Sequence, residues 1–132
     1  MGFLDDIYRQ HLLDSGLDLM NPGVYRGTVD SVRCAGRRHN VFVSVEDDAA
    51  PSVMTPIGLA ENLTEEDVRR ARDESDGCEL RVIASYAALM RPLQLNPSTG
   101  DPDVSVIINA AIDLGLYGDL VEDRISTNRE RR

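Results

Sequence analysis

The chain has 132 residues, of which 42% are hydrophobic, and it carries a net charge of −9. That length and content are typical of one globular domain and exclude a disordered chain. All 14 basic residues are arginine. The acidic, lysine-free composition argues against generic nucleic-acid binding through a broad basic face. It predicts either a halophilic protein, kept hydrated by its carboxylates, or the product of a GC-rich source.

The first predicted element is a helix over Phe3–Ser15. Its apolar residues recur at helical spacing, and Gly16 is a natural stop. His11 lies on this apolar stripe, so we expect it at the edge of the core rather than in the role of a catalytic base.

A hairpin is predicted next, after a turn at Asn21–Gly23. Its strands are Val24–Arg33 and Val41–Glu46, and Cys34–Asn40 is the loop between them. Two strands alone are marginal, so the hairpin needs a third strand and a covering helix.

Two long connections, Asp47–Asn62 and Leu89–Thr99, each contain two prolines and are predicted to be loops or arms. Both are too apolar for fully solvated loops. We therefore expect contacts with the core or with another subunit, through Met54, Ile57, Leu59, Met90, Leu93 and Leu95.

Between these connections, Thr64–Glu74 is predicted to be a surface helix, with Thr64 as N-cap and Asp67 completing a capping box. The alternating segment Cys78–Ala87 is predicted to be one half-buried strand, around which the chain is organised.

The clearest helix prediction is Asp101–Leu114, capped by Asp101 and ended by Gly115. The remainder, Leu116–Arg132, is ambiguous. A last short helix could begin near Asp119, and 124–132 is interpreted as an extended or frayed arginine-rich tail.

These elements together predict an α+β fold. A small mixed or antiparallel sheet of three to four strands is packed by an N-terminal helix and a long C-terminal amphipathic helix. Residues 1–123 form the single domain, followed by the tail 124–132.

The loop segment Arg33–Asn40, which holds three arginines, and the tail concentrate positive charge in an acidic chain. The loop could dock on an acidic neighbour, a phosphate or passing DNA, or it could be a solvated hairpin end. The tail presents the same choice. The candidate interaction residues are Arg33, Arg37, Arg38, His39, Arg129, Arg131 and Arg132.

No catalytic, metal or cofactor motif is recognised, and we expect none of the three. The paired aspartates lack the contrasting environments of an acid–base site or the ligand number of a calcium loop. Cys34 and Cys78 are expected to be free, with a disulfide as the alternative. No signal peptide and no run of about 18 apolar residues is recognised, so we expect a virion or cytoplasmic protein without a membrane span.

The order of helix, hairpin, charged helix, strand and long helix resembles the tail-completion or tail-terminator proteins of tailed phages and archaeal viruses. The segments that carry the resemblance are Gly23–Gly27, Asn40–Asp47, Asp76–Ala87 and Val104–Leu114. It implies a ring of subunits, commonly a hexamer, that caps the tail tube, meets the neck and performs no catalysis.

The leading hypothesis is therefore a non-enzymatic virion assembly protein. Its partners would be copies of itself in a ring and neighbouring structural proteins, with DNA passing through but no sequence-specific binding. One alternative is a small regulatory or nucleic-acid-binding protein that uses the arginine-rich loop and tail. A second is a small enzyme without a recognisable motif.

Overall fold

The computed structural model describes residues 3–31, 35–46, 51–74, 78–94 and 104–130, and the side chains of 3–5 and 126–130 are not described. The elements follow in the order α1 (Phe3–Asp14), β1 (Asp18–Asn21), β2 (Val24–Asp30), β3 (Arg38–Ser44), β4 (Ser52–Leu59), the short helix η1 (Ala60–Asn62), α2 (Glu65–Glu74), β5 (Glu79–Ile83), β6 (Tyr86–Pro92) and α3 (Val104–Glu130).

The α+β class is confirmed, but the sheet is larger than expected. Within the described residues it has six strands in the order β1-β2-β3-β4-β6-β5, and every neighbouring pair is antiparallel. The prediction of three to four strands was wrong because three segments were assigned otherwise: β1 was not recognised, β4 was placed in a loop, and the β5–β6 hairpin was interpreted as a strand followed by an arm.

β4 lies inside the segment expected to be a long loop. Pro51 and Pro56 suggested a loop, because proline cannot donate a ladder hydrogen bond. In the structure Pro56 lies beyond the last pair between β3 and β4, which joins Phe42 to Met54. A register shift between Pro56 and Gly58 marks a bulge in the pairing with β6. Pro56 and Gly58 therefore occupy positions where a strand tolerates them.

The predicted central strand Cys78–Ala87 is instead part of a hairpin, and it contains β5, the turn and the first two residues of β6. A turn at Ala84–Ser85 separates β5 from β6, and β5 lies at the edge of the sheet. Ala84 has a positive φ of 55°. Turns of this kind favour asparagine or glycine, so the Ala-Ser sequence gave no turn signal.

α3 continues well past the glycine that was expected to end it. It spans 27 residues, and its helical backbone includes most of the segment predicted to be an extended tail. Gly115 serves close packing, because a Cβ there would lie 3.0 Å from Cγ2 of Val29 on β2. The predicted cap Asp101–Pro102 lies outside the described residues.

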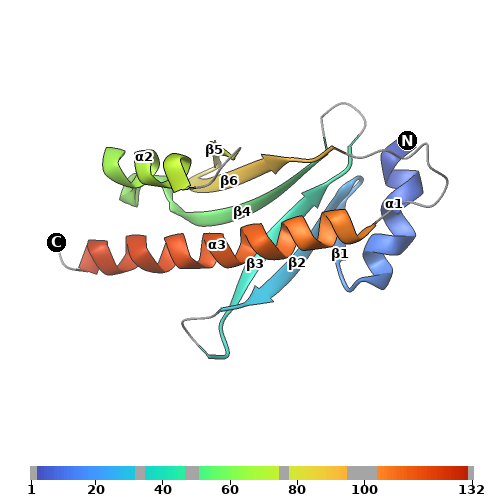
Figure 1. Cartoon of the computed structure of the whole chain (residues 1–132), viewed down its shortest axis with the longest axis horizontal. Helices are drawn as coiled ribbons and strands as arrows, with labels where there is room; N and C mark the ends of the chain where they lie inside the picture. Colours follow the sequence, from blue (N-terminus) through green and yellow to red (C-terminus); the bar gives the residue numbers. More distant parts are fainter. Residues whose placement is uncertain (1–2, 32–34, 47–50, 75–77, 95–103, 131–132) are drawn as a thin grey trace.

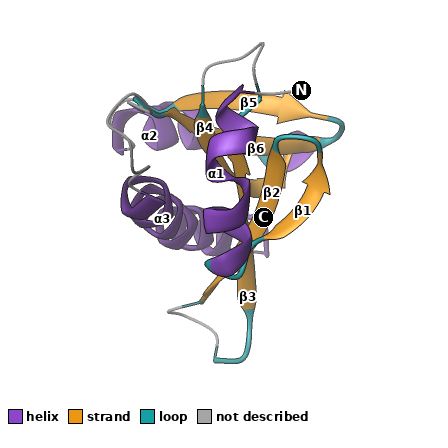
Figure 2. Cartoon of the chain, turned by 90° about the vertical axis from the view of Figure 1, so that its right-hand side faces the viewer, coloured by secondary structure: helices purple, strands orange, loops and turns teal. Residues whose placement is uncertain are grey.

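Among the elements that the structure describes, helices cover one face of the sheet. Figure 1 shows α3 running across the strands, with α1 at one end and α2 near the other, and Figure 2 shows α3 and the sheet as two layers. The face toward α3 is the core, and its largest fully buried apolar side chains are Tyr8, Leu12, Tyr25, Val43, Val45, Val53, Ile57, Leu89, Ile107 and Leu114.

The two other predicted helices are confirmed. α1 ends at Asp14, and Gly16 follows it with a φ of 92°. At the start of α2, the Thr64 amide donates to Asp67 Oδ2 at 2.9 Å and the Asp67 amide donates to Thr64 Oγ1 at 3.1 Å, which is a capping box. His11, expected at the core edge, is exposed.

Within the described residues, Val104–Ile125 of α3 is long and apolar enough to cross a membrane, with a mean hydropathy of 1.5. Asn109, Asp113 and Asp119 interrupt this segment, so it is not a continuous run of about 18 apolar residues. Core helices of globular domains meet the same criterion, and Ile107, Leu114 and Val121 are buried in the core.

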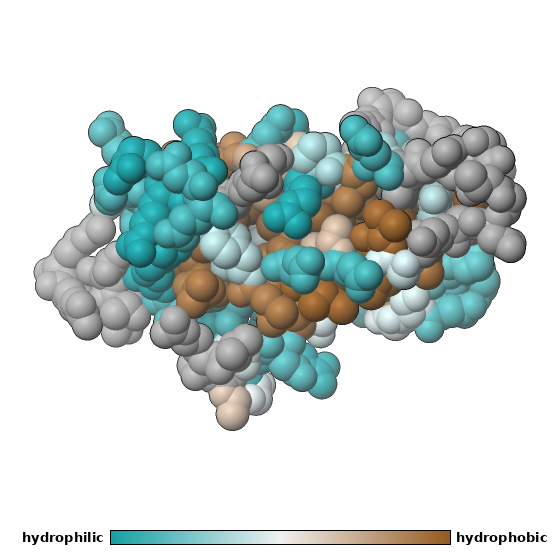
Figure 3. All heavy atoms as spheres, in the orientation of Figure 1, coloured by the Kyte–Doolittle hydropathy of each residue, from teal (hydrophilic) through white to brown (hydrophobic). Residues whose placement is uncertain are grey.

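Apolar side chains also remain at the surface on the α3 side. Figure 3 shows them gathered along the middle of this face, beside a hydrophilic region. On α3, Val106, Ile112 and Leu120 are 45%, 42% and 36% exposed.

Candidate functional site: a hollow at the fork of the sheet

The sheet divides into two halves that separate like a fork. β3 and β4 pair only over Phe42–Ser44 and Ser52–Met54. Beyond these pairs β3 continues alongside β2, and β4 continues alongside β6. In Figure 1 the β2–β3 pair and the β4–β6 pair run in different directions from this junction.

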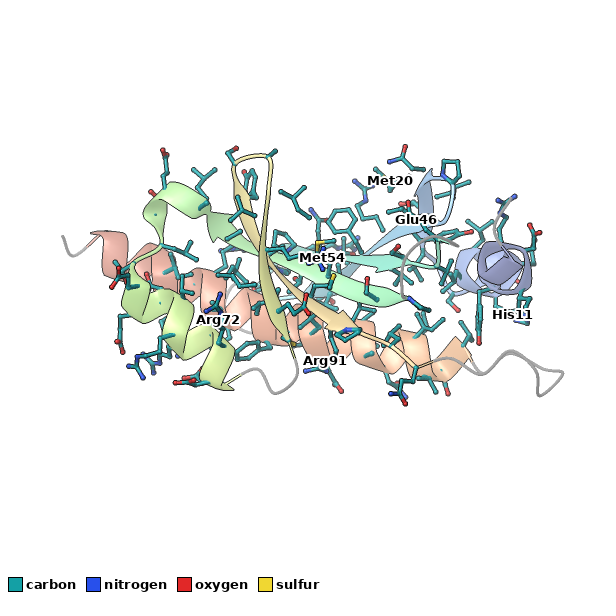
Figure 4. All side chains as sticks on the ribbon, turned by 90° about the horizontal axis from the view of Figure 1, so that it is seen from above. His11, Met20, Glu46, Met54, Arg72 and Arg91 are labelled. Atoms are coloured by element: carbon teal, nitrogen blue, oxygen red, sulfur yellow. The ribbon has the colours of Figure 1, made fainter. Side chains whose placement is uncertain are left out.

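A hollow of about 550 Å³ lies at this fork. Most of its lining comes from strand positions that alternate with the buried core residues and therefore point away from α3. Figure 4 labels Met54, one of these residues, near the middle of the sheet. The lining residues are Val24, Arg38, His39, Asn40, Phe42, Met54, Pro56, Ile83, Tyr86, Ala88 and Glu122.

The apolar walls of the hollow are partly exposed to solvent. Ile83 and Tyr86, at the tip of the β5–β6 hairpin, are 50% and 51% exposed. Phe42 and Met54 are half-buried. A concave apolar surface with a few polar groups is the usual form of a docking site for a ligand or for partner side chains.

A buried polar cluster borders the hollow. His39, Thr55 and Asp119 are 3%, 0% and 2% exposed. His39 Nε2 lies 2.8 Å from Thr55 Oγ1, and the Thr55 hydroxyl donates to the Asn40 carbonyl at 3.0 Å. In the tautomer with the ring proton on Nε2, that nitrogen donates to Thr55 Oγ1, and the imidazole does not act as a base toward the Thr55 hydroxyl.

The other ring nitrogen faces two carboxylates. His39 Nδ1 lies 3.9 Å from Asp119 Oδ1 and 4.0 Å from Glu122 Oε1. Burial nevertheless lowers the pKa of His39 below its usual 6.5, assisted by Arg37 and opposed by Asp119 and a hydrogen bond to the Pro56 backbone. The imidazole is therefore neutral at pH 7.

The two carboxylates have partners of their own. Ser31 Oγ donates to Asp119 Oδ2 at 2.7 Å, and the Arg37 guanidinium forms an ion pair with Glu122 and lies 4.0 Å from Asp119 Oδ1. The cluster therefore joins the β2–β3 hairpin to α3 through interactions that are satisfied within the chain.

Gly118 on α3 makes this close packing possible. A Cβ at this position would lie 2.5 Å from Thr55 Cγ2 and 3.1 Å from His39 Nε2. The sequence offered a signal here, because an isolated glycine inside an apolar helical pattern often marks a close approach of another element.

A second charged cluster joins α2 to α3. Arg124 Nη2 and Nη1 donate to Glu74 Oε2 and Oε1 at 3.0 and 3.2 Å, and Arg70 Nε and the Tyr117 hydroxyl donate to the same carboxylate at 2.9 and 3.1 Å. These hydrogen bonds, first those from Arg124, lower the pKa of Glu74 to about 2. This cluster holds α2 beside the end of α3.

The predicted basic docking site is altered by these contacts. Arg37 is paired with α3, His39 is buried, and Arg38 Nε lies 3.7 Å from Asp30 Oδ1. Two of the loop's three arginines thus have acidic partners in the same chain, which reduces the charge available to a nucleic acid. Arg33, Arg131 and Arg132 lie outside the described residues, and Arg129 lies on the helical backbone of α3.

The predicted apolar arms are parts of the sheet and its flanks. Ile57 is a core residue at 0% exposure, which agrees with the alternative that the core covers this segment, but it lies in a strand and not in a loop. Met54, Leu59 and Met90 are half-buried strand residues, and the half-buried Leu93 packs against the core. Leu95 lies outside the described residues. Only Met54 among these lines the hollow, whose other apolar residues were not identified from the sequence.

Cys78 is a partly buried free thiol, and Cys34 lies outside the described residues. No group of three or more metal-ligating side chains occurs within the described ranges. Comparisons with family models, curated proteins and solved structures found no match.

Proposed function

We propose that this chain is a non-enzymatic assembly subunit that associates with other copies of itself. The observation that carries the proposal is the partly exposed, apolar hollow at the fork of the sheet. Its polar neighbours are committed to one another, so the surface left for an incoming group is mainly apolar. Such a surface suits side chains from a second polypeptide.

At a finer level, we propose a subunit of a ring at the end of a virus tail. The element order supports this reading, because a helix, antiparallel strands, a charged helix, a further hairpin and a long helix follow one another. The acidic, lysine-free composition is compatible with a halophilic virion. The two apolar connections predicted from the sequence do not support the proposal, because β4 and β6 place much of those segments in the sheet.

Native mass tests the proposal. Light scattering in dilute and in molar salt should give a multiple of the 14.6 kDa chain mass. Tyr86→Asp, which puts a charge at the mouth of the hollow, should reduce this mass. Val106→Asp is the matched control, because Val106 is similarly exposed but lies on α3. A monomeric parent in both salts would reject the proposal.

A further inference from the structure

The two edges of the sheet differ in how they are protected from pairing. β1 has four residues, and its register with β2 shifts between Leu19 and Asn21. β5 has five residues, keeps a regular register with β6 and contains no proline. Exposed edges are usually blunted by bulges, prolines or charges. On β5 only the charges of Glu79 and Arg81 could serve that purpose.

The backbone hydrogen-bonding groups of β5 that do not pair with β6 belong to alternate residues. Ile83 and Tyr86 flank the two-residue turn, and in such hairpins the closing pair is hydrogen-bonded. Hydrogen-bonded and non-hydrogen-bonded pairs then alternate along the strand. The N–H and C=O groups of Leu80 and Val82 therefore point away from β6. No described strand pairs with that edge.

A second copy can pair with this edge in few registers. In an antiparallel pair around a two-fold axis, residues whose backbone N–H and C=O groups point away from β6 must lie opposite residues of the same kind in the second copy. Centring the axis on Arg81 would place two guanidinium groups opposite each other, which is destabilising. Centring it on Leu80 places Glu79 opposite the second copy's Arg81, and Arg81 opposite its Glu79. Centring it on Val82 opposes Arg81 to an isoleucine and brings the turn into the pairing.

We propose that two copies of this chain pair antiparallel along β5, with Leu80 opposite Leu80 of the second copy. The proposal rests on the self-association proposed above and adds to the hollow a second contact between copies, along the edge of the sheet. The Glu79–Arg81 ion pair, 3.1 Å within one chain, becomes part of a reciprocal network across the two copies. Val82, which is 62% exposed in the single chain, is brought against the second copy.

Single-cysteine variants test the register. In a chain with Cys34 and Cys78 replaced by serine, Leu80→Cys should form a disulfide-linked dimer under mild oxidation, because directly opposed residues lie within disulfide reach. Arg81→Cys and Val82→Cys should not. Each Arg81 is displaced from its counterpart by two positions, about 7 Å along the strand. The register would be overturned if Arg81→Cys or Val82→Cys cross-linked as well as Leu80→Cys, or if Leu80→Cys did not cross-link.

Charge reversal tests the same register without a core substitution. Glu79→Arg alone and Arg81→Glu alone should each weaken the dimer about tenfold or more in dilute buffer, because both cross-strand pairs then repel. An equimolar mixture of the two variants should restore the dimer, since each positive strand meets a negative one. Asp113→Arg, an exposed change of the same charge on α3, is the control and should leave the mass unchanged.

The outcomes separate the two proposals. Suppose that the parent self-associates, that its Leu80→Cys form does not cross-link, and that each charge variant still associates with itself. This combination rejects β5 pairing but retains the proposal that the chain is an assembly subunit. A monomeric parent rejects both. Far-UV circular dichroism of each variant establishes that the fold is retained.

Discussion

The two faces of the sheet are built from neighbouring residues on the same strands, but they have different surroundings. On β6, Leu89 points toward α3 and is fully buried, whereas the adjacent Met90 points away and is half-buried. On β3, Val43 and Phe42 make the same contrast. Strand alternation therefore separates side chains that stabilise the domain from those available to a partner.

The largest expected difference between the faces is in stability. Leu89→Ala should lower the free energy of unfolding by about 2–5 kcal/mol, because it removes buried methyl groups and leaves a cavity. Met90→Ala should lower it by about 1 kcal/mol or less. Urea denaturation followed by circular dichroism measures both. Similar losses for the two variants would mean that a partner or another element covers the outer face.

A smaller effect is expected where α3 approaches the sheet. Gly118→Ala should destabilise the chain by about 1–2 kcal/mol net, because overpacking against Thr55 exceeds the gain in helix propensity. Gly115→Ala should cost less, since its nearest atoms are Val29 methyl carbons at 3.0 and 3.1 Å. Asn109→Ala, exposed on the same helix, is the control. Thermal denaturation ranks the three, and a stabilised Gly118→Ala would contradict the close approach.

The smallest effect depends on pH. Burial lowers the pKa of His39, so the unfolded chain takes up its proton first on acidification. The contribution of neutral His39 is fully present above about pH 6.5. It is lost as the pH falls from there through the lowered folded-state pKa, with a slope of at most about 1.4 kcal/mol per pH unit. His39→Gln should lack this component of the stability profile, and His11→Gln should keep it.

The sequence predicted the parts of the fold whose signals are local. Apolar spacing indicated α1, Thr64 and Asp67 indicated the start of α2, and the alternation of Val41, Val43 and Val45 indicated β3. β4 was missed because Pro56 is tolerated only at the fork, which depends on strands distant in the sequence. The end of α3 was misplaced because Gly115 and Gly118 are explained by contacts with Val29 and Thr55, which the chain order does not reveal.

The candidate site was predicted less well than the fold. Met54 was identified for its hydrophobicity, but the hollow combines residues from β2, β3, β4, β5, β6 and α3. The histidine and arginine at its border were expected to be exposed because their loop is basic. Their partners, Asp119 and Glu122, lie in a segment whose structure was ambiguous from sequence. Such pairings arise only when the helix packs on the sheet.

The long helix also has a mechanical consequence. α3 contacts both halves of the fork, touching β2 and β3 on one side and β4 and β6 on the other. The C-terminal part of α3 carries Arg124, which forms an ion pair with Glu74. A neighbouring subunit that tilts this part of α3 would therefore change the angle between the two halves of the sheet and the width of the hollow. Spin labels on the tips of the β2–β3 and β5–β6 hairpins would detect this change as a change in the distance between them. A distance that stays the same on assembly would rule the change out.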